Sequence, residues 1–291
     1  AHLTVLVKPW VADLVRMHTA VDDVMVYERP GRHDGLAGLF TLARELRRRR
    51  FDAAILLQNA FEAAVIARLA GIPVRAGYST DARGLLLTHP VRLQPGMKTV
   101  HQSLYYLGML ETLGFRPSST AVSLVPSEAQ RQAAQRHLAE LGIAGRRPLV
   151  GMAPGAAYGP AKRWFPERFA AVADRLAGRY ACPVLLFGSA GDRPSTEAVQ
   201  SAAKTALVDV AGRTSLGDAI ALIACCDLFI TNDSGLMHVA GALGVPTVAV
   251  FGSTNPETTY PLGGKTVLVR RPVDCSPCLK PECPTDFRCM D

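Results

Sequence analysis

Residues 228–251 read L-F-I-T-N-D-S-G-L-M-H-V-A-G-A-L-G-V-P-T-V-A-V-F and predict a strand, a helix and a second strand in close succession. The apolar runs at residues 228–231 and 247–251 are typical of buried strands, and the stretch 235–243 between them is typical of a helix. Two strands that are joined by a helix pair in parallel. This stretch therefore predicts a parallel sheet of the α/β class.

The same alternation extends to both sides of this stretch. The other predicted strands are residues 3–7, 24–27, 51–57, 74–78, 148–152, 184–187 and 207–210. The other predicted helices are residues 11–18, 38–50, 59–70, 101–113, 127–141, 166–179, 196–206 and 215–225. Residues 116–127 are rich in Pro, Ser and Thr, as in a linker. We therefore predict two α/β domains, residues 1–120 and 127–291, whose parallel sheets face a central cleft, and we expect the apolar run 51–57 to be a central strand.

The composition is that of a folded protein without a dedicated nucleic-acid surface. The chain has 291 residues, of which 48% are hydrophobic and 20% are charged, and this excludes general disorder. Its net charge of +7 is spread diffusely, without a stripe of Lys and Arg interleaved with aromatic residues. The longest uncharged stretch, residues 234–256, contains Gly241, Gly244 and Pro246 and predicts a helix and a buried strand rather than a membrane span.

The loop after the predicted strand 148–152 carries a candidate phosphate site. It reads A-P-G-A-A-Y-G-P-A-K-R-W over residues 153–164. Gly155 allows close backbone approach to a ligand, and Lys162 brings positive charge to the start of a helix. The pattern is neither a P-loop nor G-x-G-x-x-G. It predicts a phosphate-binding loop, with an ordinary Gly-Pro turn as the alternative.

The loop 231–238, T-N-D-S-G-L-M-H, ends a strand and opens a helix. It offers the carboxylate of Asp233, the hydroxyl of Ser234 and free backbone N–H groups to a ligand, with His238 one turn further. The alternative is that Asp233 or Ser234 only caps the helix and that His238 lies in the core. Two more loops, F-G-S-A-G-D and V-A-G-R-T-S-L, follow other strands of the same domain. Four such loops at one sheet edge predict a nucleotide cleft.

Four strings together resemble the bacterial lipopolysaccharide heptosyltransferase family, most closely its heptosyltransferase II members: P-G-A-A-Y-G-P-A-K-R-W, L-F-G-S-A-G-D, A-G-R-T-S-L and T-N-D-S-G-L-M-H-V-A-G-A-L. The resemblance implies a GT-B fold with two Rossmann-like domains, ADP-heptose bound by residues 127–291 and an acceptor bound by residues 1–120. It also implies an inverting single displacement, without a catalytic cofactor. This displacement moves L-glycero-D-manno-heptose to the inner-core heptose of lipopolysaccharide on a Kdo–lipid A acceptor.

The resemblance also implies roles for individual residues. Lys162 stabilises the charge on the departing ADP, together with the helix N-terminus near Ser234. The donor-binding residues that it implies are Gly155, Lys162, Gly188, Gly212, Thr214, Leu216, Asp233, Ser234, Gly235, Leu236 and His238. The basic candidates for contact with acceptor phosphates or carboxylates are Arg75, Arg83, Lys98 and His101. The alternative for each of these four is a solvated surface charge.

Family members begin with a strand and a glycine-containing loop whose Asp acts as general base, ahead of the strand that corresponds to residues 3–7. We therefore expect this chain to lack the first strand–helix unit, so that the base lies upstream of Ala1, with Asp13 in W-V-A-D as the alternative base. The family's closing helix is likewise expected to be missing after Asp291. The alternative function is a truncated, non-catalytic homologue that binds ADP-sugar and zinc. A sugar-nucleotide epimerase is disfavoured because its paired carboxylates and His are not recognisable.

Four cysteines, Cys275, Cys278, Cys283 and Cys289, follow the spacing C-x2-C-x4-C-x5-C in the C-terminal segment 275–291. Four soft ligands meet the ligand count of a tetrahedral structural zinc site. Reduced thiols, disulfides and an iron–sulfur cluster are the alternatives, and we expect catalysis not to require the cluster. The remaining cysteines are expected to be small core residues: Cys182, Cys225 and Cys226.

The resemblance implies ADP-heptose and a lipid A–Kdo–heptose acceptor as partners. No secretory signal is visible, and we expect a cytoplasmic protein that contacts the cytoplasmic face of the inner membrane peripherally. The excess of basic residues is larger in the first half of the chain, which suits an anionic acceptor at that surface. We expect a monomer and no nucleic-acid partner.

Overall fold

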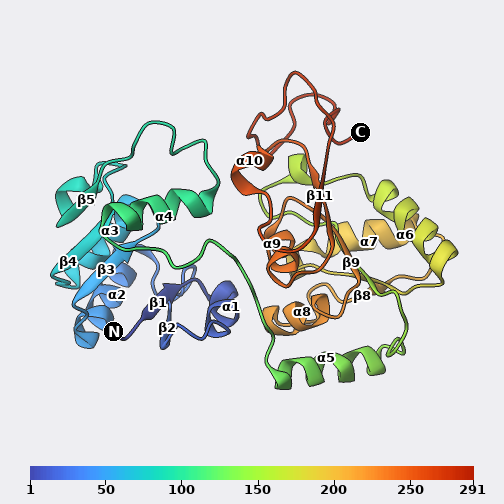
Figure 1. Cartoon of the computed structure of the whole chain (residues 1–291), viewed down its shortest axis with the longest axis horizontal. Coiled ribbons are helices and arrows are strands. Elements are labelled where there is room, and N and C mark those ends of the chain that lie inside the picture. Colours follow the sequence, from blue (N-terminus) through green and yellow to red (C-terminus); the bar gives the residue numbers. More distant parts are fainter. The chain divides into compact units, whose positions relative to one another are not determined.

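The computed structural model describes residues 1–291 as two compact units, Ala1–Thr120 and Ala121–Asp291 (Figure 1). The division falls within the segment that is rich in Pro, Ser and Thr. Every strand pairing is parallel, which confirms the predicted α/β class for both units. No helix combines the length and the apolar character that crossing a bilayer needs.

The first unit contains two small parallel sheets. One pairs β1 (Thr4–Val7) with β2 (Asp23–Val26), and the other has the order β3 (Ala53–Leu56), β4 (Val74–Tyr78), β5 (His89–Val91). Its helices are α1 (Ala12–Arg16), α2 (Gly35–Arg49), α3 (Phe61–Leu69) and α4 (Gln102–Thr112), with 3-10 turns at Pro9–Val11 and Arg83–Leu86. The apolar face of α2 packs Leu42 and Leu46 against Ile66 of α3 in one core cluster of the unit. A second cluster forms around Tyr78 and Met109.

The prediction that residues 51–57 form a central strand is wrong. β3 lies at the edge of its three-stranded sheet, because it pairs with β4 on one side and with no strand on the other. Ala54 and Leu56 pack on the core, whereas Ala53 and Ile55 on the other face are exposed. A continuous apolar run therefore does not distinguish a strand that is buried on both faces from an edge strand with one covered face.

The second unit is built on one six-stranded parallel sheet in the order β11-β10-β9-β6-β7-β8. The strands are β6 (Val150–Ala153), β7 (Val184–Leu186), β8 (Val208–Asp209), β9 (Leu228–Asn232), β10 (Thr247–Phe251) and β11 (Thr266–Arg270). The helices are α5 (Glu128–Glu140), α6 (Pro166–Tyr180), α7 (Arg193–Ala202), α8 (Leu216–Ile223), α9 (Gly235–Ala242) and α10 (Pro256–Thr259), with 3-10 turns at Pro160–Lys162 and Ala190–Asp192. The sequence prediction missed β11, although its T-V-L-V run is typical of a strand.

One face of this sheet carries the main core of the second unit. Met152 of β6 and Ile230 of β9 pack against Phe169 of α6, and Val199 of α7 joins the same cluster. Each of these apolar side chains is nearly or fully buried. The two central strands, β6 and β9, are therefore tightly packed, and this packing fixes where the loops that follow them begin.

Candidate functional site

The carboxyl ends of β6, β9 and β10 meet at one edge of the sheet, because these strands are parallel neighbours. The loops that follow them are residues 154–164, 233–234 and 252–255. The sequence indicated the first two as ligand-binding loops. It did not indicate the third, which the sheet order brings to the same edge.

Asn232, the last residue of β9, holds both ends of the loop 154–164. Its side chain is fully buried, donates from Nδ2 to Pro154 O at 2.7 Å and accepts from Trp164 N at 3.0 Å. Both backbone groups come from the segment that follows the neighbouring strand, so one amide side chain sets the width of the loop. The sequence showed an Asn at this position but no signal for this anchoring role.

Lys162 and Asp233 form the polar centre of this edge. The Lys162 ammonium donates to Asp233 Oδ2 at 2.6 Å, and the hydroxyl of Thr254 donates to the same oxygen, also at 2.6 Å. Asp233 is 5% exposed, so its carboxylate needs these charge-assisted partners. The ring centre of Tyr158 lies 4.9 Å from the ammonium, a cation–π contact. The side chains of three loops therefore meet on one buried carboxylate.

The N-terminus of α9 lies beside this pair and has no side-chain cap. Ser234 occupies the N-cap position without a capping hydrogen bond, and its hydroxyl lies 3.2 Å from Thr231 Oγ1. Gly235 faces open space, Leu236 is half-buried and His238 is exposed. The interpretations of Ser234 as a simple cap and of His238 as a core histidine are therefore wrong. A helix start with a nearby lysine favours an anion.

Gly155 and Gly188 serve loop packing. A Cβ at Gly155 would lie 2.2 Å from Asp192 Oδ1, and one at Gly188 would lie 2.7 Å from Asp192 Cβ. Gly212 has φ of 66°, and its N–H donates to Gly188 O at 2.9 Å. These glycines let the loops after β6, β7 and β8 pack together, which is a structural reason for the G-rich strings.

Thr214 and Leu216 flank the start of α8 and are half-buried. This helix start differs from that of α9, because Ser215 Oγ caps it by accepting from Asp218 N at 3.1 Å. The start of α9 thus lacks the capping side chain that the start of α8 has.

Two of the basic acceptor candidates are structural. Arg83 is fully buried, and its guanidinium donates to Tyr78 O at 2.7 Å, to Asn59 Oδ1 at 2.9 Å and to Gln58 O. Burial lowers the pKa of this guanidinium. Arg75 donates to Leu86 O at 2.8 Å and to further carbonyls of its own loop. The solvated-charge interpretation is wrong for Arg83, and internal acceptors occupy both guanidinium groups.

The other first-unit candidates differ in exposure. Lys98 is exposed, whereas His101 is buried at the N-cap of α4, where its Nδ1 accepts from Ser103 N at 3.2 Å. Asp13 lies in the first turn of α1 and pairs with Arg16 at 3.0 Å. Roles for these residues in binding or catalysis stay predictions.

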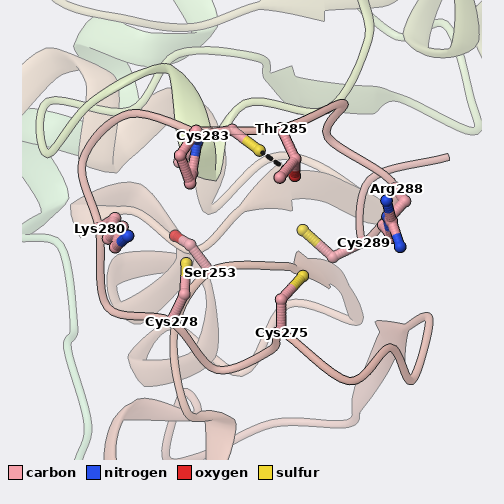
Figure 2. A pocket seen from close by; sticks show the side chains of 10 residues that line it. Ser253, Cys275, Cys278, Lys280, Cys283, Thr285, Arg288 and Cys289 are labelled. Carbon is pink, nitrogen blue, oxygen red and sulfur yellow. Dashed lines mark hydrogen bonds between the residues drawn. The ribbon is translucent and has the colours of Figure 1, made fainter.

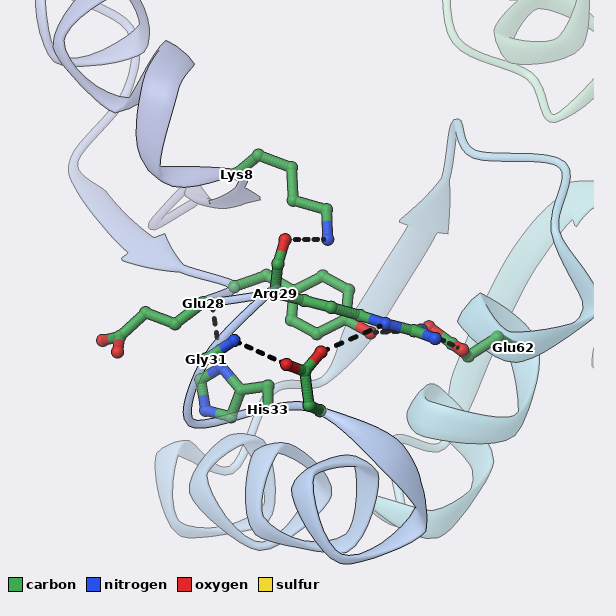
Figure 3. Close-up of polar contacts among 8 residues, drawn as sticks. Lys8, Glu28, Arg29, Gly31, His33 and Glu62 are labelled. Carbon is green, nitrogen blue, oxygen red and sulfur yellow. Dashed lines mark hydrogen bonds and ion pairs between the residues drawn. The ribbon is translucent and has the colours of Figure 1, made fainter.

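A polar network at the carboxyl ends of β1 and β2 was not predicted (Figure 3). Tyr27 donates its hydroxyl to Glu62 Oε1 at 2.6 Å, and Arg29 binds the other oxygen of Glu62. The Lys8 ammonium lies 3.9 Å from the Tyr27 ring centre and donates to Arg29 O at 3.1 Å. Hydrogen bonds from Arg29 and then from Tyr27 lower the pKa of Glu62. Burial, followed by the bond to Glu62, raises the pKa of Tyr27.

We predict an acid-sensitive contribution of Glu62 to the stability of the first unit. Its pKa in the folded chain is below the ordinary 4.5, so the contribution is present above pH 4.5 and is lost as the pH falls through the lower folded value. Glu62→Gln should therefore cost about 0.5 to 1 kcal/mol at pH 7, because the pair is partly exposed, and less at pH 3. Urea unfolding at both pH values measures this, with Glu111→Gln as the exposed control. An equal loss for Glu62→Gln at both pH values would contradict the assignment.

Parallel α/β units with a lysine and a helix start at one sheet edge are features of the GT-B glycosyltransferases. The sequence model of the family described as glycosyltransferase family 9 (heptosyltransferase) matches residues 39–287, and the chain belongs to this family. The GT-B-like class predicted from the sequence is thereby confirmed.

Individual relatives point the same way. The chain is 36% identical to lipopolysaccharide heptosyltransferase 2 of Escherichia coli K12 over 79% of its own length and 68% of that protein. It is 34% identical to lipooligosaccharide heptosyltransferase 2 of Haemophilus influenzae, over 77% of this chain and 66% of the relative. The chain thus spans about two-thirds of the length of these curated relatives.

Solved structures extend the likeness. The alignment with the structure of E. coli ADP-heptose LPS heptosyltransferase II covers 93% of this chain and 82% of that chain, with a TM-score of 0.78 and 31% sequence identity. The alignment with the crystal structure of a family 9 glycosyl transferase from Veillonella parvula covers 92% of this chain and 76% of that chain, with a TM-score of 0.82 and 30% sequence identity.

Proposed function

We propose that the chain moves L-glycero-D-manno-heptose from ADP-heptose to the inner-core heptose of lipopolysaccharide, in one inverting displacement. The observation that carries the proposal is the Lys162 ammonium, held 2.6 Å from buried Asp233 beside the N-terminus of α9. Relatives that match more than three-quarters of the chain and are named heptosyltransferases support it. They also favour a transferase over a non-catalytic binder of ADP-sugar.

The geometry suits the departure of a nucleoside diphosphate. When the acceptor oxygen forms its bond to the anomeric carbon, its proton passes to a general base. The bond to ADP breaks at the same time, and negative charge collects on the β-phosphate. Lys162 and the N–H groups of Gly235 and Leu236 would stabilise this charge, because they form one positive region. Asp233 orients the lysine, and Thr254 fixes the carboxylate. No catalytic cofactor belongs to this proposal.

The remaining parts of the proposal concern the acceptor and the place of reaction. We assign the acceptor to the first unit, with exposed Lys98 as a basic group that meets its phosphates or carboxylates. A lipid-linked acceptor implies work at the cytoplasmic face of the inner membrane. The net charge of +7 favours peripheral contact with an anionic surface, and we propose that the chain acts there as a monomer.

A transfer assay tests the function. The chain is incubated with ADP-heptose and a Kdo–lipid A acceptor that already carries one heptose, and ADP release and acceptor mass are followed. We expect one heptose to be added for each ADP released, and no transfer to an acceptor that lacks the first heptose. Tight binding of ADP-heptose without transfer would support the non-catalytic alternative, and the absence of binding would overturn the proposal.

A further inference from the structure

The thiols of the C-terminal segment share one cavity of about 90 Å³ (Figure 2). They belong to Cys275, Cys278, Cys283 and Cys289, and none of them is in a disulfide. The cavity is also lined by Ala161 and Ser253, which are sequence neighbours of the site residues Lys162 and Thr254. A short segment has thus brought four soft donors to one place, which adjoins two loops of the candidate donor site.

Polar groups lie close to the sulfur of Cys283. Cys283 Sγ accepts a hydrogen bond from Phe287 N at 3.3 Å and lies 3.5 Å from Thr285 Oγ1. Hydrogen bonds to sulfur favour the thiolate, which is the form that binds metal. The hydroxyl of Ser253 is a second, independent sign: its residue is 1% exposed, it lines the cavity, and it has no hydrogen-bond partner. A thiolate in the cavity would give this buried donor its missing acceptor.

The charges at the cavity fit a metal bound by four thiolates. Lys280 and Arg288 line the same space as the sulfurs. A divalent ion with four thiolates keeps an excess of two negative charges, and two nearby cations offset this excess. Soft thiolates in a set of four select zinc among the common divalent ions that keep one oxidation state.

We propose that Cys275, Cys278, Cys283 and Cys289 bind one zinc ion, and that this ion braces the loop that carries Lys162. The sulfurs surround the cavity, but no three of them already stand at metal-binding spacing, so binding draws them inward. Each thiol that coordinates the ion loses its proton to solvent, so binding releases up to four protons.

The brace consists of hydrogen bonds from the residues between the second and third cysteines. The backbone O of Leu279 accepts from the Tyr158 hydroxyl at 2.6 Å, and Leu279 N donates to Ser253 O at 2.7 Å. Pro281 O accepts from Ala161 N at 3.0 Å. These three bonds tie one stretch of the segment to the loops 154–164 and 252–255, which supply Lys162 and Thr254 to the buried carboxylate of Asp233.

Gly159 shows how close this contact is. A Cβ at this position would lie 2.3 Å from Pro281 O, and the φ of 150° is itself unfavourable for other residues. The loop and the segment therefore pack backbone to backbone. Zinc that orders the segment 275–291 would therefore also order the backbone amides of the loop 154–164. These include the amide of Ala161, which immediately precedes Lys162.

Zinc binding and amide exchange test the proposal together. The purified chain should contain one equivalent of zinc, and removal of the ion by a chelator should speed hydrogen exchange of the peptide that spans residues 157–163 at least about tenfold. Added Zn²⁺ should restore the slow exchange. Cys278→Ser and Cys283→Ser should lower zinc affinity about 10- to 100-fold, whereas Cys225→Ser, outside the cluster, should not.

Gly159→Ala separates the brace from the metal site. This variant keeps all four thiols, so it should still bind zinc, but exchange of residues 157–163 should be fast in both the loaded and the metal-free chain. Removal of zinc should also lower the affinity for ADP about tenfold. This last expectation rests on the proposed function, whereas the zinc and exchange measurements do not. Iron in place of zinc, or disulfides among the four cysteines, would overturn the zinc assignment. Zinc binding without slower loop exchange would overturn the brace.

Discussion

Replacing Lys162 with alanine is expected to lower the rate of heptose transfer at saturating substrate by about 100-fold or more. The lysine is the cation that the structure holds against the α9 N-terminus, through a 2.6 Å bond to Asp233. Its charge matters most when negative charge collects on the departing diphosphate, so kcat should fall more than KM rises. Steady-state measurement of both constants with ADP-heptose checks this split.

Two variants sharpen the test. Lys265→Ala removes an exposed lysine of the same unit and should leave both constants unchanged. Asp233→Asn should also be slow, and the double variant Lys162→Ala with Asp233→Asn should be little slower than the worse single variant, because the two side chains act as one pair. Full activity of Lys162→Ala, or additive losses in the double variant, would remove the pair from the mechanism.

Arg83→Met is expected to destabilise the first unit by about 3 to 5 kcal/mol. The guanidinium is fully buried and joins Tyr78 O, Gln58 O and Asn59 Oδ1. Methionine fills part of the volume but leaves three acceptors without a donor in a place that water does not reach. The unfolding transition of the first unit in urea, followed at several wavelengths, measures the loss.

Arg92→Met is the matched control, since Arg92 is exposed and its replacement should change stability by less than about 0.5 kcal/mol. Arg83→Lys should be intermediate, because one ammonium cannot reach all three acceptors. If Arg83→Met proved as stable as the wild type but bound acceptor poorly, Arg83 would return to the acceptor site and the structural role would be wrong.

Much of the second unit could be predicted because its signals are local. The strand at residues 247–251 coincides with β10, and the helix predicted at residues 235–243 matches α9 within one residue. Lys162 and Asp233 were chosen as candidates because glycines, a lysine and a helix start recur where parallel strands end. The structure brings these two side chains into contact, although 71 residues separate them.

The same reasoning failed where burial depends on distant partners. Arg83 carries a charge, so the sequence placed it at the surface or in an anion site. In the structure it is buried, and it binds the carbonyl of Tyr78 at the end of β4 and that of Gln58 just after β3. Thr254 and Asn232 have no sequence signature for their roles, because their partners lie on other strands. Ile55 is apolar but exposed, because its strand lies at a sheet edge.

The sequence by itself therefore determined the α/β class, the family and the two loops that carry Lys162 and Asp233, because periodicity and turn chemistry are properties of neighbouring residues. Only the tertiary structure decided which side chains meet on the Asp233 carboxylate, which arginine is buried, and that the cysteine segment packs behind the Lys162 loop. These contacts depend on strand order and long-range packing, which join residues far apart in the chain and leave no periodic trace in it.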